Sequence, residues 1–379
     1  MRGPAVRSIV IAAGGTGGHL FPAEALAAEL LARGERVALM TDARSSAFDS
    51  AAFASADRFV LRGSGLAGRG PLRAAGGAFG LAAGTVQARG LLARLNASAV
   101  VGFGGYPSVP PVLAALTMRS DERPATILHE QNGVLGRANR LLAPRSSALA
   151  LSFADTVSVP GSARVEVVGN PVRPALAALA GGGYPHADGG NALRLLVLGG
   201  SLGARVFADV VPGAVAALPE ELRGRLVVAQ QCRPEDMGRV REAYAAAGVP
   251  AQLSPFFPDV AGRLATAHLV VARAGAGTVA ALPCAGRPSV LVPLPHAIDD
   301  HQSANARTLA AAGAAWVVPQ AGFAPAPLAE RLSALLADPD ALAAAAAAAV
   351  LAQPEAARRL ADLVLSLVRP AATEQVSPR

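Results

Sequence analysis

SIVIAAGGTGG (residues 8–18) is a short apolar run that enters a glycine-rich turn, and LRLLVLGGSLG (residues 193–203) repeats the pattern. Each apolar run is too brief for a helix, and helix-like sequence follows each turn. The pattern is typical of a buried parallel strand that leads into a helix N-terminus. Such a turn directs free backbone N–H groups and the positive end of a helix dipole at one point, which favours an anion. The duplication predicts two Rossmann-like α/β halves that face each other across a cleft.

The length of 379 residues and the content of 52% hydrophobic residues allow two domains with separate cores. No apolar run approaches the roughly 18 residues that span a bilayer. The apolar stretch near the N-terminus ends in the glycine turn and not in a cleavage site, so we expect a cytoplasmic protein. The two cysteines, Cys232 and Cys284, lack metal-ligand spacing, so the sequence indicates neither a disulfide nor structural zinc.

The formal net charge is +7, and all 34 basic residues are arginine. A basic balance fits phosphorylated ligands, nucleic acid or an anionic membrane surface. Aromatic residues make up only 4% of the chain and no nucleic-acid-binding motif occurs, so we expect no nucleic-acid partner.

Strand-like and helix-like segments alternate in both halves, which predicts parallel sheets. The first helix is predicted over Pro22–Arg33, and the Ala/Leu-rich segment Pro327–Pro370 is also expected to be helical. In the first half the predicted strands are Ser8–Ala13, Arg36–Met40, Ala97–Gly102, Thr126–Leu128, Ala148–Leu151 and Val165–Val168. In the second half they are Leu193–Leu198, Arg225–Ala229, His268–Ala272 and Ser289–Pro293.

Gly181–Asn191 (GGGYPHADGGN) is glycine-rich, polar and unpatterned, as expected of a linker. We therefore expect an N-terminal domain over residues 1–175, a linker over 176–191 and a C-terminal domain over 192–354. A C-terminal helix, residues 355–372, is expected to pack back on the N-terminal domain.

The two glycine turns do not match the common nucleotide-binding motifs. When the dinucleotide fingerprint GxGxxG is aligned to start at Gly15, its third glycine position is occupied by Leu20. When it is aligned to start at Gly200, its second glycine position is occupied by Leu202. The P-loop motif GxxxxGK[ST] is absent, and the chain has no lysine to serve it. Dehydrogenase and P-loop functions therefore become minor alternatives.

Polar side chains follow several predicted strands, where open parallel sheets bind ligands. His19 follows the first turn and could act as a general base or merely cap the helix. Tyr106, in FGGYPS (103–108), taken alone is best interpreted as a packed tyrosine in a tight turn. HEQN (129–132) has four polar residues in a row, which favours a site, and Glu130 is its acidic member.

The second half has similar features. RAGAGT (273–278) follows a predicted strand, and its small residues let backbone amides approach a diphosphate. PLPHAIDDHQSANA (293–306) is a long polar loop that contains Gln302. Arg173, at the end of GNPVR (169–173), is either a cation of the cleft or a solvated charge near the linker.

Seven segments carry these features: GGTGGH (14–19), FGGYPS (103–108), HEQN (129–132), GNPVR (169–173), GGSLGAR (199–205), RAGAGT (273–278) and HQSANA (301–306). In this order and spacing they resemble the undecaprenyl-diphospho-muramoylpentapeptide β-N-acetylglucosaminyltransferases, the MurG family. Singly the motifs are weak, but jointly they are specific. The resemblance implies the GT-B fold, in which two Rossmann-like domains with parallel sheets face each other across a cleft.

The resemblance also implies a reaction, which is inverting transfer of N-acetylglucosamine from UDP-GlcNAc to the muramyl O4 of lipid I, giving lipid II for peptidoglycan. It implies no metal and no cofactor. The implied partners are UDP-GlcNAc, lipid I, an anionic membrane surface and a cell-wall synthesis complex, and the implied location is the cytoplasmic face of the inner membrane, with peripheral attachment.

The matching positions imply two sets of site residues. Three are implied catalytic residues, with His19 as the first candidate for the base: His19, Tyr106 and Glu130. The implied donor-binding residues are Thr16, Gly17, Gly18, Asn132, Arg173, Ser201, Phe257, Ala276, Gly277, Thr278, Val279, Ala280, Ala281 and Gln302.

Two single residues and one short segment depart from the family pattern, all on the donor side. Ala281 stands where the family usually has a glutamate that holds the donor ribose, and Leu202 replaces the glutamine of GGSQGAR. The segment usually written HQ[ST]GK is Gln230–Pro234 (QQCRP). Two other functions therefore stay open, namely another GT-B nucleotide-sugar transferase and a catalytically weakened relative that acts as a binding subunit.

A lipid acceptor requires a membrane-facing surface, which we expect in the N-terminal domain between Arg62 and Arg94. Basic and apolar residues alternate there, namely Arg62, Arg69, Arg73, Arg89 and Arg94 with Leu66, Leu72, Phe79, Leu81, Leu91 and Leu92. Such a surface binds an anionic leaflet through both kinds of residue. The alternative is an ordinary amphipathic helix pair whose leucines face the core.

Overall fold

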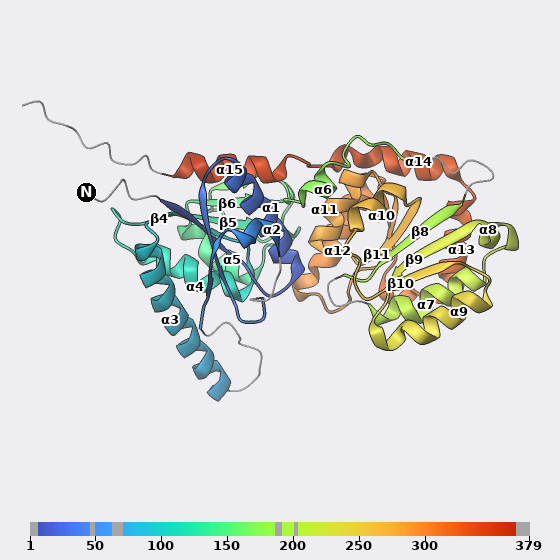
Figure 1. Cartoon of the computed structure of the whole chain (residues 1–379), viewed down its shortest axis with the longest axis horizontal. Coiled ribbons are helices and arrows are strands. Elements are labelled where there is room, and N and C mark those ends of the chain that lie inside the picture. Colours follow the sequence, from blue (N-terminus) through green and yellow to red (C-terminus); the bar gives the residue numbers. More distant parts are fainter. Residues whose placement is uncertain (1–6, 46–49, 63–70, 186–191, 201–203, 369–379) are drawn as a thin grey trace, which may run out of the picture. The chain divides into compact units, whose positions relative to one another are not determined.

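The computed structural model describes residues 7–45, 50–62, 71–185, 192–200 and 204–368, which form two compact units (Figure 1). Unit 1 comprises Met1–Gln131, Leu135–Pro171 and Glu355–Arg379. Unit 2 comprises Asn132–Val134 and Val172–Pro354. Each unit contains one parallel sheet with helices, so the predicted α/β class is confirmed.

Unit 1 has a seven-stranded sheet in the order β3-β2-β1-β4-β5-β6-β7, and every neighbouring pair is parallel. The order places the first strand at the point where the winding reverses, as in Rossmann folds. The strands are β1 (Ser8–Ala12), β2 (Arg36–Thr41), β3 (Asp57–Val60), β4 (Ala97–Gly102), β5 (Ala125–Glu130), β6 (Ala148–Leu151) and β7 (Val165–Val167).

Alternate residues of β1 enter two different cores of unit 1. Ile9 and Ile11 pack in one cluster with residues of α1 and α15, whereas Val10 packs in another with residues of α3 and α4. This explains why the strand is apolar throughout, because both of its faces are covered. The helical segments of this unit are α1 (Gly17–Ala32), α2 (Ala51–Ala54), α3 (Pro71–Arg94), α4 (Gly105–Leu116), α5 (Arg137–Leu142), η1 (Ala143–Arg145) and α15 (Ala356–Leu367).

The C-terminal helix α15 lies against α1 in unit 1 (Figure 1). Leu360 and Val364 of α15 are fully buried in the same cluster as Ile9. Arg33, at the end of α1, donates from Nη1 to the carboxylate of Asp362 at 2.6 Å. The last helix therefore completes the covering of one face of this sheet.

Unit 2 repeats the plan with a six-stranded parallel sheet in the order β10-β9-β8-β11-β12-β13. Its strands are β8 (Leu193–Leu198), β9 (Leu226–Gln231), β10 (Ala251–Ser254), β11 (Leu269–Ala272), β12 (Ser289–Leu291) and β13 (Ala315–Val317). Its helical segments are α6 (Pro174–Ala177), α7 (Arg205–Ala216), α8 (Glu220–Arg225), η2 (Pro234–Asp236), α9 (Met237–Ala246), α10 (Val260–Thr266), α11 (Ala276–Ala285), η3 (Ile298–Asp300), α12 (His301–Ala311), η4 (Gln320–Gly322), α13 (Pro325–Leu336), α14 (Pro339–Ala347) and η5 (Ala348–Leu351).

Part of the glycine-rich stretch before β8 is anchored in unit 2. The hydroxyl of Tyr184 donates to the backbone oxygen of His268 at 3.0 Å. Arg287, which is only 6% exposed, donates from Nη1 to the backbone oxygen of Gly183 at 2.9 Å. These bonds hold the stretch as far as Tyr184 on the body of unit 2.

The elements differ from the prediction where the hydrophobic pattern is weak. Three strands were not predicted: β3, β10 and β13. Each lies at the edge of its sheet and is only three or four residues long, with residues that are not fully buried. The first helix begins at Gly17 and contains Pro22, whereas the sequence predicted its start at Pro22. Among the described residues, no helix combines the length and the apolar character needed to span a membrane.

Candidate active site

The glycine turn of unit 1 connects β1 to α1 and is held by the end of β2. Gly15 has a φ of +90°, which a residue with a side chain rarely adopts, and its N–H donates to Ser45 Oγ at 2.7 Å. Asp42, fully buried directly after β2, accepts from the Ser45 N–H at 3.0 Å. A Cβ on Gly14 would lie 3.0 Å from Asp42 Oδ1 and from Pro107 Cγ, so the turn is tightly packed.

Thr16, Gly17 and Gly18, three of the implied donor contacts, lie together at the N-terminus of α1. Thr16 is the N-cap residue in an extended conformation, and its side chain makes no capping hydrogen bond. It is exposed, and the two glycines are partly exposed. The first turn of this 16-residue helix contains no acidic side chain. Its N–H groups and positive dipole end are therefore suited to an anion.

His19 is partly exposed. It lies in the first turn of α1, beside the glycine loop that precedes α4. His19 Nδ1 lies 3.0 Å from Gln131 Oε1. A Cβ on Gly105 would lie 3.2 Å from His19 Nε2, so only a glycine leaves this much room for the imidazole. Gly104 and Gly105 have φ values of +79° and +68°. The loop FGGYPS thus supports the imidazole from one side and Gln131 from the other.

The predicted strand before HEQN is longer than expected. β5 continues through His129 and Glu130, which pair with Ala150 and Leu151 of β6. His129 is fully buried, and its Nε2 lies 2.9 Å from the backbone oxygen of Gly169. Burial lowers the pKa of His129 to about 4, so its imidazole is neutral at neutral pH.

The side chain of Glu130 contacts a different part of unit 1 from that of His129. It is 3% exposed, and its Oε2 accepts from the N–H of Gly136 at 2.9 Å and from Asn139 Nδ2 at 3.0 Å. Gly136 is the N-cap residue of α5. The carboxylate therefore stabilises the start of that helix and the turn that leads to it.

Tyr106 is attached to the long helix α3. It lies in the first turn of α4, and its hydroxyl donates to the backbone oxygen of Gly77 at 3.3 Å. Partial burial raises the pKa of this hydroxyl. Tyr106 thus joins the loop that supports His19 to α3.

In unit 2 the second glycine turn is held by Gln231, the last residue of β9. Gly200 has a φ of +81°, matching Gly15 in unit 1. The Gly199 N–H donates to Gln231 Oε1 at 3.1 Å, and Gln231 Nε2 donates to the backbone oxygens of Gly200 and Pro255 at 3.0 and 3.1 Å. Ser201 and Leu202 lie outside the described residues.

The six implied donor contacts Ala276–Ala281 form the first part of α11. Gly275 is its N-cap residue, and the first turn has no acidic side chain. Gly277 and Thr278 are partly exposed there. Ala281 lies in the second turn and is 5% exposed. The helix start is thus open to an anion, while the position of the family glutamate carries only a methyl group.

The expected long loop at residues 293–306 is wrong at its end, because α12 begins at His301 and contains Gln302 and Asn305, which contacts Asn132. Fully buried Asn305 donates from Nδ2 to Asn132 Oδ1 at 3.1 Å and to the backbone oxygen of Ala274 at 3.0 Å. Gln302 Oε1 accepts from the N–H of Leu294 at 3.0 Å. Unit 2 therefore holds Asn132 close to the turn before α11.

Phe257 and Arg173 complete the implied set. Phe257 follows β10 and is 3% exposed, with the guanidinium of Arg263 3.9 Å from its ring centroid. Its ring is therefore buried beneath the guanidinium of Arg263. Arg173 is the partly buried N-cap residue of the short helix α6.

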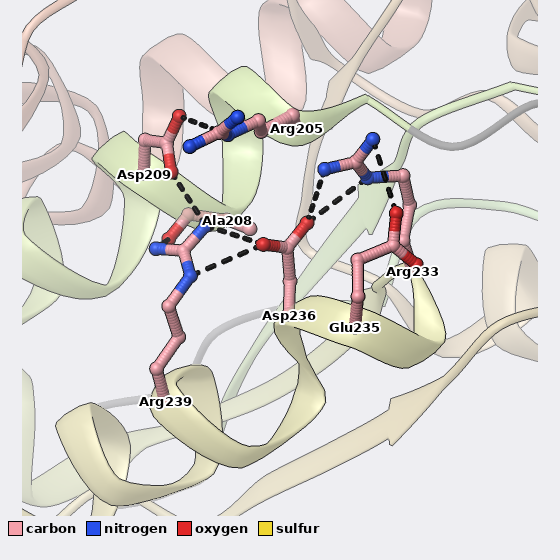
Figure 2. A network of polar contacts seen from close by, with 7 residues as sticks. All are labelled: Arg205, Ala208, Asp209, Arg233, Glu235, Asp236 and Arg239. Atoms are coloured by element: carbon pink, nitrogen blue, oxygen red, sulfur yellow. Dashed lines mark hydrogen bonds and ion pairs between the residues drawn. The ribbon is translucent and has the colours of Figure 1, made fainter.

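The segment that departs from the family pattern at residues 230–234 leads into an ion-pair network (Figure 2). Asp236, 5% exposed, accepts two hydrogen bonds from Arg239 and two from Arg233. Hydrogen bonds from Arg239 above all, and then from Arg233, hold the pKa of Asp236 below its ordinary value. Arg239 also pairs with Asp209 of α7. The guanidinium of Arg233 is therefore neutralised locally by Glu235 and Asp236 of η2, whereas Arg239 joins α9 to η2.

Three residues that support the site were not predicted in that role: Asp42, Ser45 and Gln231. Asp42 and Gln231 stand at the carboxyl end of a strand next to β1 or β8. That position is the signal that could have identified them. Among the described residues, no group of three or more His, Cys, Asp or Glu side chains is arranged to hold a metal ion.

The chain matches two family models that together cover most of its length. Residues 9–150 match the glycosyltransferase family 28 N-terminal domain, and residues 194–364 match the glycosyltransferase family 28 C-terminal domain. The chain belongs to glycosyltransferase family 28. The two matched regions contain both glycine turns and the helices that follow them.

Proteins of other bacteria are similar over nearly the whole chain. A protein of Granulibacter bethesdensis is 58% identical, covering 96% of this chain and 94% of its own length. One of Acidiphilium cryptum is 56% identical, covering 97% and 99%. Both are named UDP-N-acetylglucosamine--N-acetylmuramyl-(pentapeptide) pyrophosphoryl-undecaprenol N-acetylglucosamine transferase. The crystal structure of Acinetobacter baumannii MurG superposes with a TM-score of 0.74 at 30% identity, covering 95% of this chain and 99% of that one. The predicted family and the GT-B fold are confirmed.

The buried His129 predicts how stability depends on pH. Its pKa is about 4 in the folded chain and 6.5 in an unfolded one, so the unfolded chain binds the proton first as the pH falls. This contribution to stability is complete above pH 6.5 and is lost below it, by at most about 1.4 kcal/mol per pH unit, until the pH nears 4. Denaturant unfolding across that range should show a shallower pH dependence for His129→Asn than for the wild type. Equal dependence in the two proteins would contradict the assignment.

Proposed function

We propose that this chain transfers N-acetylglucosamine from UDP-GlcNAc to the muramyl O4 of lipid I and so forms lipid II for peptidoglycan. The observation that carries the proposal is the repeated glycine turn, which is followed by α1 in unit 1 and by α7 in unit 2, two helices whose first turns contain no acidic side chain. Family membership and the names of the similar proteins support the same reaction.

Unit 2 binds the donor in this proposal. The start of α11, from Ala276 to Ala281, and the turn at Gly200 face the diphosphate, and the resemblance assigns Ser201 to the same donor set. Asn132, Arg173 and Gln302 add polar contacts, and the backbone of Phe257 contacts the uracil. Oriented dipoles stabilise the negative charge that develops on the departing UDP. In unit 1 the N-terminus of α1, with Thr16, Gly17 and Gly18, is another such group of dipoles suited to an anion.

Unit 1 binds the acceptor and supplies the base. His19 Nε2 takes the proton of the muramyl O4 hydroxyl as that oxygen attacks C1 of the donor sugar from the face opposite UDP. The bond from C1 to the UDP oxygen breaks, UDP leaves with the bonding electron pair, and the configuration at C1 inverts. Glu130 positions the turn after β5 through α5, and Tyr106 keeps the acceptor-side loop attached to α3.

A UDP-release assay tests the reaction and the base together. Wild-type protein should release UDP from UDP-GlcNAc when a lipid I analogue is present, and little without it. General-base catalysis contributes about 10²–10⁴-fold, so His19→Ala should lower kcat by that order while UDP affinity changes little. A loss of less than about threefold would favour a purely structural role for His19 through its hydrogen bond to Gln131. No acceptor-dependent release by the wild type would refute the proposed function.

Because Ala281 has no charged group to hold the donor ribose, we expect this chain to bind the ribose weakly. A hydrogen bond to a charged group contributes about 1.5–3 kcal/mol, or roughly ten- to a hundredfold in affinity. Ala281→Glu should therefore tighten UDP binding in calorimetry by about that factor. Ala281→Gln is the matched control, because it adds a side chain of the same size without the charge and should gain less. Equal affinities for wild type and Ala281→Glu would mean that another group already holds the ribose.

A membrane-binding surface on unit 1 is the second part of the proposal. The end of α3 nearer Pro71 projects beyond the other elements of unit 1 (Figure 1). Phe79 and Val86 of α3 are 78% and 72% exposed, and their spacing of seven residues puts them on one face of the helix. Leu92 is instead fully buried, so part of the predicted stripe faces the core.

The basic residues of this surface have different surroundings. Arg62 is exposed. Arg89 donates to the backbone oxygen of Thr117 at 2.6 Å, and the guanidinium of Arg94 lies 5.4 Å from the ring centroid of Phe59. Arg69 and Leu66 lie outside the described residues, as do the side chains of Arg73 and Leu72. Arg62 is therefore the clearest described cation for an anionic surface. The surface would bring the chain to the cytoplasmic face of the inner membrane, as a peripheral protein beside other cell-wall enzymes.

Vesicle co-sedimentation tests this surface. Binding should require anionic lipid and weaken with salt, since each basic residue near the surface contributes about 1 kcal/mol. The double variant Phe79→Ser, Val86→Ser should bind less. Val157→Ser is the matched control, because Val157 is 54% exposed elsewhere in unit 1 and should have no effect. Equal binding to neutral vesicles, or equal loss in the control, would reject this surface.

A further inference from the structure

We propose that Gln131 is a positioning residue that fixes the tautomer of His19, so that His19 carries its proton on Nδ1 and presents an unprotonated Nε2. The inference rests on the proposed function, in which His19 accepts the proton of the sugar hydroxyl. All the contacts that carry it lie within unit 1 and form one line of hydrogen bonds from the backbone of Gly169 to His19.

The carbonyl of Gly169 determines which atom donates and which accepts in each of these hydrogen bonds. A carbonyl oxygen can only accept a hydrogen bond, and His129 Nε2 lies 2.9 Å from it, so Nε2 carries a proton. His129 is fully buried, and its pKa of about 4 keeps the ring neutral at neutral pH. A neutral imidazole has one N–H, so His129 Nδ1 is an acceptor.

The next step fixes the amide of Gln131. Its Nε2 lies 2.9 Å from His129 Nδ1 and 3.0 Å from the backbone oxygen of His129. Both of these atoms accept, so the amide nitrogen must face them with its two hydrogens. The reverse orientation would place Oε1 against two acceptors. Gln131 is 1% exposed, so water would not compensate for that loss.

The last step fixes His19. Gln131 Oε1 now faces His19 Nδ1 at 3.0 Å, and an amide oxygen only accepts, so Nδ1 carries the proton. The hydrogen bond made by one ring nitrogen decides the state of the other, and Nε2 is left with its lone pair. Gly104 and Gly105 hold the ring, since a Cβ on either would lie 3.6 and 3.2 Å from its atoms.

An amide at position 131 has a different effect from a carboxylate. A carboxylate beside an imidazole adds a negative charge that stabilises the imidazolium. The neutral amide of Gln131 orients the ring without adding a charge. A base must be unprotonated before it reacts, so a lone pair held on Nε2 suits proton transfer from a sugar hydroxyl.

Nitrogen NMR of ring-labelled histidine in the full chain tests the assignment. The chain has six histidines, and the His19 signals are those that disappear in His19→Asn. In the wild type, His19 should be protonated on Nδ1 and His129 on Nε2, with His129 remaining neutral at acid pH where exposed histidines titrate. Gln131→Met keeps a similar length but has no polar end, and should let His19 populate the Nε2-protonated form.

Kinetics give the second measurement. Gln131→Met should lower kcat about tenfold with little change in KM for UDP-GlcNAc, because the substitution affects the base and not the donor contacts. Gln353→Met makes the same exchange at a partly exposed glutamine of unit 2 and should leave both constants unchanged.

The outcomes separate this inference from the proposed function. A wild-type His19 protonated on Nε2 would overturn the inference without any variant, as would an unchanged tautomer in folded Gln131→Met. The expected spectra in a protein that transfers no sugar would support the tautomer assignment and contradict the proposed function.

Discussion

A parallel sheet covered on both faces restricts polar chemistry to the ends of its strands, and both units depend on this restriction. The side chains of β1 and most of those of β8 are buried, so the turns that follow are the first points at which polar groups can meet a ligand. Each turn needs one residue with a positive φ, supplied by Gly15 and Gly200. The helix that follows then concentrates positive potential at the same place.

The side chains that support the two glycine turns differ between the units, but neither carries a charge. In unit 1 the group that contacts the turn is the hydroxyl of Ser45, and in unit 2 it is the amide of Gln231. Both are neutral. The nearby carboxylate of Asp42 is satisfied by the N–H of Ser45 and by the guanidinium of Arg44. Because a free carboxylate at the turn would compete with a bound phosphate, neutral support preserves the potential of the helix.

Sequence predicted the parts that depend on continuous apolar runs, and missed those that depend on partners far along the chain. The central strands, the glycine turns and the C-terminal helices follow from local pattern. The edge strand β13 does not, because its Trp316 and Val317 are only partly buried and the strand has no long apolar run. The polar run HEQN identified its place in unit 1, but the separate partners of its members are not encoded in their spacing. Gly169 lies 40 residues from His129, and Gln131 lies 112 from His19.

The backbone geometry of a strand explains how HEQN performs several tasks at once. Successive side chains at a strand point to opposite faces, so His129 and Gln131 share one side while Glu130 lies on the other. The first pair leads to His19, and the carboxylate leads to α5. Asn132, the next residue, belongs to unit 2 through Asn305. A four-residue motif thus carries three separable functions, and losses caused by substitutions within it need not report on the same step of the reaction.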